Sequence, residues 1–166
     1  VDELLSNEKS EKKQSDYIYE SRTEYDIDGK KNFDIKLGGA YAVDLKAYHG
    51  EKIEVTMFSN VYKNLPADYK VKIDDIKNRI DIDLNRFNEA SEADAKESLV
   101  ITIFIPVKYI GKIELSVNAR TLNITDIENG HIEVNGRISE VTLQGNKSEI
   151  EIDSNLDMQI SVLSHD

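Results

Sequence analysis

The sequence predicts an all-β domain, and three features lead to this prediction. Short segments alternate apolar and polar residues, as in the run IDIDL at residues 80–84. Such alternation places every second side chain on one face of a strand. The segments recur at steps of mostly eight to ten residues, which is enough for a short strand and a turn. A helical period of about 3.6 residues explains none of them.

The predicted strands follow one another along nearly the whole chain. Residues 1–16 carry eight charged side chains and are expected to form a flexible polar tether. Residues 17–166 are expected to form a single β domain. Two insertions interrupt its spacing, one near residues 59–68 and an acidic one near residues 86–98. The first inward-facing residue of each predicted strand is, in order, Tyr25, Phe33, Val43, Ile53, Val71, Ile80, Leu99, Ile113, Leu122, Ile132, Val141, Ile150 and Met158.

Two architectures fit this spacing. In an antiparallel β-sandwich, consecutive strands pair through hairpins, whereas in a β-solenoid two segments form one coil of roughly 19 residues and the coils stack. From Ile113 onward the steps are nine, ten, nine, nine and eight residues. This regularity favours a single-chain β-solenoid (β-helix) with an irregular N-terminal cap. The antiparallel β-sandwich remains the alternative, because pairs such as Asp28-Gly29 and Asn135-Gly136 suit hairpins as well as solenoid corners.

A recurring pattern in the second half resembles a known family. The pattern is a hydrophobic strand ending in Ile-Pro, a short link, and then strands of small, apolar and polar residues; it covers LVITIFIPVK at 99–108, GKIELSV at 111–117, LNITDI at 122–127, GHIEV at 130–134 and GRI at 136–138. It is similar to the bacterial putative-adhesin family of unknown function, and the similarity extends over residues 33–166. The resemblance implies a β-solenoid, a position outside the membrane behind an anchor, and no catalytic motif. The acidic insertion and the total of eight glycines depart from the family pattern.

The composition argues against several function classes. The chain has 21 Lys and Arg against 32 Asp and Glu, a formal net charge of −11. Such an acidic chain is repelled by nucleic-acid backbones and anionic lipid. It contains no Cys, which excludes disulfide scaffolds and thiolate metal sites. Because the chain begins with Val1 rather than Met, we expect an extracellular domain tethered to the membrane through a removed N-terminal anchor; a cytoplasmic protein is the alternative.

No pattern in the sequence predicts catalysis, a metal or a cofactor. The three histidines are His49, His131 and His165, and no two have the sequence spacing of metal ligands. The GxSxG motif of a serine nucleophile is absent from the sequence. We therefore predict that the protein is not an enzyme and that it needs no cofactor.

An enzyme remains the alternative, because pairs of carboxylates lie two positions apart on single predicted strands. Asp81 and Asp83 form one such pair, and Glu149 and Glu151 form another. A carboxylate-based polysaccharide-active enzyme uses two carboxyl groups at a comparable separation. However, a catalytic acid needs burial to raise its pKa, and these positions are predicted to face water.

The outward positions of the C-terminal strands form the candidate binding site. We predict a non-enzymatic cell-envelope or surface binding module, adhesin-like, whose partner is a protein or a glycan at the cell surface. The alternatives are the polysaccharide-active enzyme and a cytosolic assembly protein that stacks through its end strands. The residues predicted to line the exposed β face are Asn123, Thr125, Glu133, Asn135, Thr142, Glu149 and Glu151.

Overall fold

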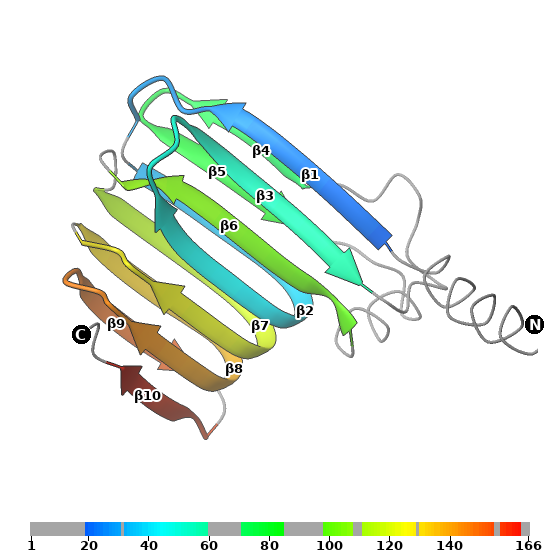
Figure 1. Ribbon diagram of the computed structural model, residues 1–166, viewed down its shortest axis with the longest axis vertical. Coiled ribbons are helices and arrows are strands. Elements are labelled where there is room, and N and C mark those ends of the chain that lie inside the picture. The colour runs from blue at the N-terminus through cyan, green and yellow to red at the C-terminus, as the bar shows by residue number, and fades with distance from the viewer. Residues whose placement is uncertain are drawn as a thin grey trace, which may run out of the picture.

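The computed structural model describes residues 19–30, 32–59, 71–84, 98–107, 111–128, 130–154 and 157–163, which form ten β-strands (Figure 1). The all-β prediction is confirmed. Nothing helical in the described ranges is long and apolar enough to cross a membrane. The strands are β1 (Tyr19–Asp26), β2 (Asn32–Tyr48), β3 (Lys52–Ser59), β4 (Lys72–Ile76), β5 (Arg79–Leu84), β6 (Val100–Pro106), β7 (Lys112–Thr125), β8 (His131–Gln144), β9 (Glu149–Ser154) and β10 (Gln159–Leu163).

The predicted tether and most of both predicted insertions lie outside the described residues. Two described residues mark where the insertions begin and end. Ser59 ends β3 and Ser98 precedes β6, and their hydroxyl oxygens are 2.6 Å apart. The residue where the first insertion begins and the residue where the second insertion ends are therefore in contact.

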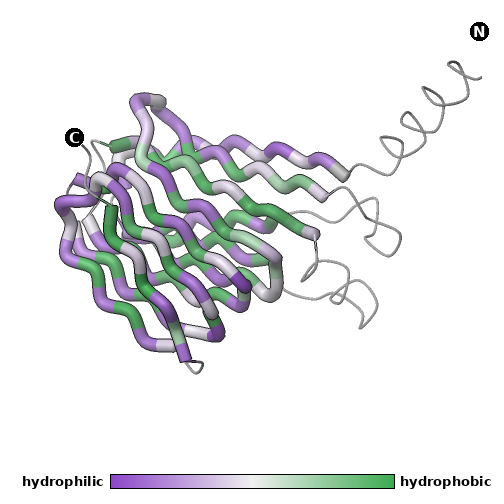
Figure 2. Tube along the Cα trace, turned by 60° about the horizontal axis from the view of Figure 1, so that its bottom comes forward, coloured by the Kyte–Doolittle hydropathy of each residue, from purple (hydrophilic) through white to green (hydrophobic). Residues whose placement is uncertain are grey.

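Three long strands, β2, β7 and β8, turn back on themselves, so that each contributes to two layers (Figure 1). The first layer contains β4, β5, the first halves of β2, β7 and β8, and then β9. The second layer contains β1, β3, β6, the second halves of the same long strands, and then β10. Hydrophobic and hydrophilic residues alternate along these strands (Figure 2).

Strands of the C-terminal part pair in parallel at offsets of eighteen or nineteen residues. Ile113 lies opposite Ile132, nineteen residues further along the chain, and Ile132 lies opposite Ile150 after eighteen. At the other end, β1–β3, β3–β6 and β4–β5 are antiparallel. The sheet is therefore mixed, and it runs from β1 to β10 without closing. The choice between a β-solenoid and a β-sandwich stays a prediction.

The N-terminal half does not follow chain order. β2 lies between β5 and β6 on one side and β7 on the other, although β3 to β6 all follow it in the sequence. A simple coil-by-coil path would have placed β3 beside β2. Instead β3 pairs with the far side of β6, so that β2 lies inside the stack.

The C-terminal strands are longer than the sequence predicts. The segments that begin at Ile113 and Leu122 are predicted as separate short strands, but they are the two halves of β7, and β8 is continuous in the same way. β8 bends at Gly136, where φ is 129°. A Cβ atom there would clash with the carbonyl oxygen of Val117. Glycine is therefore needed at this bend, because the neighbouring backbone leaves no room for a side chain.

One apolar core lies between the layers. The inward residues predicted from Phe33 to Val141 are all buried, and Tyr25, Ile150 and Met158 pack against them while partly exposed. The β9–β10 end of the two layers is open, because no described strand lies beyond β9 and β10. Its inward residues Ile160 and Val162 are therefore 49% and 74% exposed.

Candidate functional site

The outward side chains of the first layer form a row of carboxylates. In each pair of neighbouring strands, an acidic residue lies opposite an acidic residue. Adjacent strands are about 4.8 Å apart, so that six strands extend over roughly 24 Å. What we call the carboxylate row contains, from β4 across to β9, Asp74, Asp81, Asp34, Glu114, Glu133 and Glu151.

Basic side chains lie beside the row and partly balance its charge. Like charges directly opposite each other on a sheet repel. Arg79 Nε lies 2.5 Å from Asp81 Oδ1, and this hydrogen bond is the main reason that the pKa of Arg79 is raised. Lys112 Nζ lies 3.2 Å from Glu114 Oε1 and 3.8 Å from Glu133 Oε1. The hydrogen bond to Glu114 is likewise the main cause of the raised pKa of Lys112.

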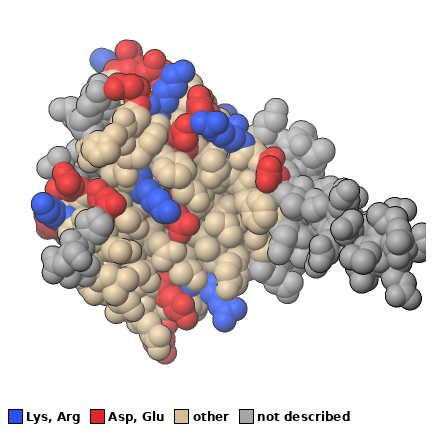
Figure 3. All heavy atoms as spheres, viewed as in Figure 1, with Lys and Arg blue, Asp and Glu red and all other residues tan. Residues whose placement is uncertain are grey.

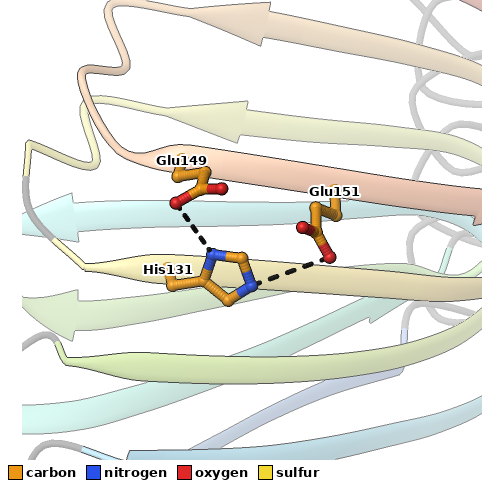
Figure 4. Close-up of side chains that lie close together, drawn as sticks. All are labelled: His131, Glu149 and Glu151. Atoms are coloured by element: carbon orange, nitrogen blue, oxygen red, sulfur yellow. Dashed lines mark ion pairs between the residues drawn. The ribbon is translucent and has the colours of Figure 1, made fainter.

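At the β8–β9 end of the row, a histidine lies close to three carboxylates, two of which, those of Glu149 and Glu151, are drawn with it in Figure 4. His131 Nε2 is 3.3 Å from Glu133 Oε1 and 3.8 Å from Glu151 Oε2. His131 Nδ1 is 3.5 Å from Glu149 Oε2. The imidazole is 29% exposed, whereas Glu149 and Glu151 are 75% and 63% exposed. Both ring nitrogens therefore face carboxylates that water also reaches.

The outward side of the second layer is chemically different. Its central row is mostly hydroxyl and amide groups, and Figure 3, which looks onto this layer, shows a largely uncharged surface with scattered charged residues. The one carboxylate of this central row, Asp44, accepts a hydrogen bond of 2.6 Å from the Asn123 side chain. What we call the hydroxyl row contains, from β3 across to β10, Thr56, Thr102, Asp44, Asn123, Thr142 and Ser161.

The seven predicted site residues divide between these two surfaces. The structure brings four of them together on β8 and β9 of the first layer, where Glu133 is part of the carboxylate row. The other three lie on the second halves of β7 and β8, on the outer side of the second layer. Their role in binding stays a prediction. The first group is Glu133, Asn135, Glu149 and Glu151, and the second is Asn123, Thr125 and Thr142.

Sequence reasoning missed most of the carboxylate row. Glu114 and Glu133 are nineteen residues apart, so the predicted coil length could have aligned them. No offset could have placed Asp34 beside both Asp81 and Glu114, because that requires β2 to lie out of chain order. The spacing of the histidines along the chain gives no sign of the carboxylates near His131, because Glu149 and Glu151 come close to it only through the register of β8 with β9.

A depression lined by described residues lies away from the carboxylate row. It encloses about 890 Å³ where the second layer ends, and Tyr48, His49, Asp126, Asn146 and Val162 are among the residues lining it. None of its lining residues belongs to the carboxylate row.

Comparisons with known proteins give structural neighbours only. No protein-family model matches the chain, and no curated protein matches it. A putative cell adhesion protein from Clostridium sporogenes is 12% identical with a TM-score of 0.49, over 89% of this chain and 100% of that one. A putative adhesin from Parabacteroides distasonis is 12% identical with a TM-score of 0.41, over 81% of this chain and 55% of that one. A putative lipid binding protein from the same species is 11% identical with a TM-score of 0.42, over 87% of this chain and 61% of that one. Similarity at this level establishes no function for this chain.

Proposed function

We propose that this protein is a non-enzymatic surface binding module that holds a basic segment of a partner protein along the carboxylate row. The observation that carries the proposal is the register of β4, β5, β2, β7, β8 and β9, which aligns six carboxylates on one outer surface. A row of evenly spaced carboxylates whose backbone positions are fixed by strand pairing suits a partner with several lysine or arginine side chains.

The expected energetics are those of many weak contacts. An exposed ion pair contributes at most about 1 kcal/mol, so affinity depends on how many carboxylates are engaged at once. Such binding is weakened by salt, because exposed charges are screened within about 8–10 Å at physiological ionic strength. Strand pairing fixes the backbone positions of the six acidic residues, which lowers the entropy cost of binding several of them at once.

The proposal also includes a scaffold and a location. We propose that the coils of β2 and β5–β10 form a short β-solenoid, which the parallel offset of eighteen to nineteen residues supports. We further propose that the module works at the outer cell surface as an adhesin-like protein. Labelling of intact cells with a membrane-impermeant biotin reagent tests this location, and failure to label the protein would contradict it.

The binding role is tested with a ten-residue lysine peptide as the probe. In one variant, Asp34→Asn, Glu114→Gln and Glu133→Gln together neutralise the centre of the carboxylate row. A control variant, with Glu20→Gln, Glu128→Gln and Glu140→Gln, changes the net charge equally away from the row. Fluorescence anisotropy should show about tenfold weaker binding for the row variant, because three weak ion pairs of about 0.5 kcal/mol each are lost. The control variant should bind nearly as well as the unmodified protein.

The two variants distinguish binding at the carboxylate row from a general attraction of the peptide to the negative net charge of the protein. Equal weakening in both would mean that the peptide responds only to net charge, and it would contradict the proposal. Circular dichroism on both variants checks that each is folded before the affinities are compared.

A further inference from the structure

A second cluster of ionisable side chains lies at the β8–β9 end of the first layer. His131 lies directly opposite Glu149, and Glu133 lies directly opposite Glu151. The four side chains therefore occupy a two-by-two grid on one side of two paired strands. Because all four positions belong to hydrogen-bonded strands rather than to loops, the backbone holds the grid in place.

The grid has more negative charge than its surroundings balance. Lys112 lies within ion-pair distance of Glu133. For Glu149 and Glu151, His131 is the only basic side chain within ion-pair distance in the part of the chain that the structure describes. A neutral imidazole adds no positive charge, but it offers a nitrogen lone pair to a metal ion.

We infer that His131, Glu149 and Glu151 bind a divalent first-row transition metal ion, of which Zn²⁺ is the representative. Each residue offers one ligand atom, and the three atoms all lie within 4.8 Å of one another. In a tetrahedral zinc site the ligand atoms are about 3.4 Å apart, so closing the site requires the two exposed glutamates (Figure 4) to rotate toward the same nitrogen of His131. The metal supplies the positive charge that these carboxylates lack.

The ligand set also selects the class of metal. An imidazole nitrogen suits zinc, copper and nickel, whereas calcium and magnesium prefer oxygen ligands alone. The imidazole has a second nitrogen facing a carboxylate, and a ring N–H donated to such a group is the usual way in which a metal-binding histidine is oriented. With Nδ1 as the ligand atom, the Nε2–H group is left to donate to Glu133, whose Oε1 lies 3.3 Å away, and Glu133 orients the ring in this way.

The test is isothermal titration calorimetry of the full chain with Zn²⁺ alone. We expect one Zn²⁺ per chain with micromolar affinity. His131→Gln should remove this binding, and Glu149→Gln and Glu151→Gln should each weaken it at least about tenfold, because loss of a direct ligand costs no less than loss of a residue that orients one. His49→Gln and His165→Gln are the matched controls and should leave the affinity unchanged. Because this test uses no basic peptide, its result is independent of the function proposed above.

Several outcomes would overturn the inference. One is the absence of binding at millimolar Zn²⁺, and another is unchanged affinity in His131→Gln. A third is Ca²⁺ binding as tight as that of Zn²⁺, since it would show that carboxylates alone form the site. A histidine-selective NMR spectrum gives a second readout: on Zn²⁺ addition the ring resonances of His131 should shift, while those of His49 should not.

Discussion

The two layers of this protein share the three long strands β2, β7 and β8, yet their outer surfaces differ. On β7, the first half presents Glu114 to the outside and the second half presents Asn123; on β8, the corresponding residues are Glu133 and Thr142. The inward residues of both halves are Ile, Leu, Val and Ala, nearly all buried. The comparison shows that the core restricts only every second position. The remaining positions can therefore differ in chemistry between the layers without changing the fold.

The largest loss of stability is expected when a charged residue is placed in the core between the two layers. Ile132 is fully buried between the layers, so Ile132→Asp should abolish cooperative folding, because a buried unpaired carboxylate is very costly. Its neighbour Glu133 points outward, and Glu133→Lys should change the free energy of unfolding by less than about 0.5 kcal/mol. Urea denaturation of both variants measures the difference. Similar losses at the two positions would show that the inward and outward assignments are wrong.

A smaller effect is expected where β8 passes from one layer to the other. Gly136→Ala adds a methyl group against the Val117 carbonyl at a positive φ, and it should cost about 3 kcal/mol or more. Gly29→Ala is the matched control, because Gly29 also has a positive φ but has open space around it. It should cost only about 1 kcal/mol. Thermal unfolding of the two variants ranks these costs, and a larger loss at Gly29 would contradict the close approach at the bend.

The smallest expected effect concerns the charge balance of the carboxylate row. Glu114 raises the pKa of Lys112 above its ordinary value of 10.5. The charged lysine therefore stabilises the folded state below pH 10.5, and this contribution is lost as the pH rises through the raised pKa. Lys112→Gln should show a smaller fall in stability above that pH than the unmodified protein. Lys147→Gln, which removes a lysine with no ion pair among the described residues, should not differ from the unmodified protein.

Sequence reasoning recovered the elements that depend on alternation. The inward residues from Phe33 to Val141 were identified correctly, because a buried strand face requires apolar residues at every second position. The interval of roughly 19 residues also corresponds to the observed offset between Ile113 and Ile132. Both features are local, or repeat at a constant interval, and so they are visible in one sequence.

Other features depend on contacts between distant segments. The position of β2 between β5 and β7 leaves no periodic trace, so Asp34 could not be assigned to the carboxylate row. The continuity of β7 and β8 through their bends was also missed, because a bend and a turn use similar residues, as at Asn135-Gly136. The proximity of His131 to Glu149 and Glu151 requires the register of β8 with β9, which the sequence indicates only approximately.

The most direct test of the carboxylate row uses the absence of cysteine from the chain. Asp34→Cys combined with Glu114→Cys places two thiols at directly opposite positions of β2 and β7, within the usual range for a disulfide. Asp34→Cys combined with Ser116→Cys places them two residues out of register. Mild oxidation should cross-link the first pair and leave the second reduced, as mass spectrometry would show. Cross-linking of the second pair but not the first would contradict the alignment on which the proposed binding surface depends.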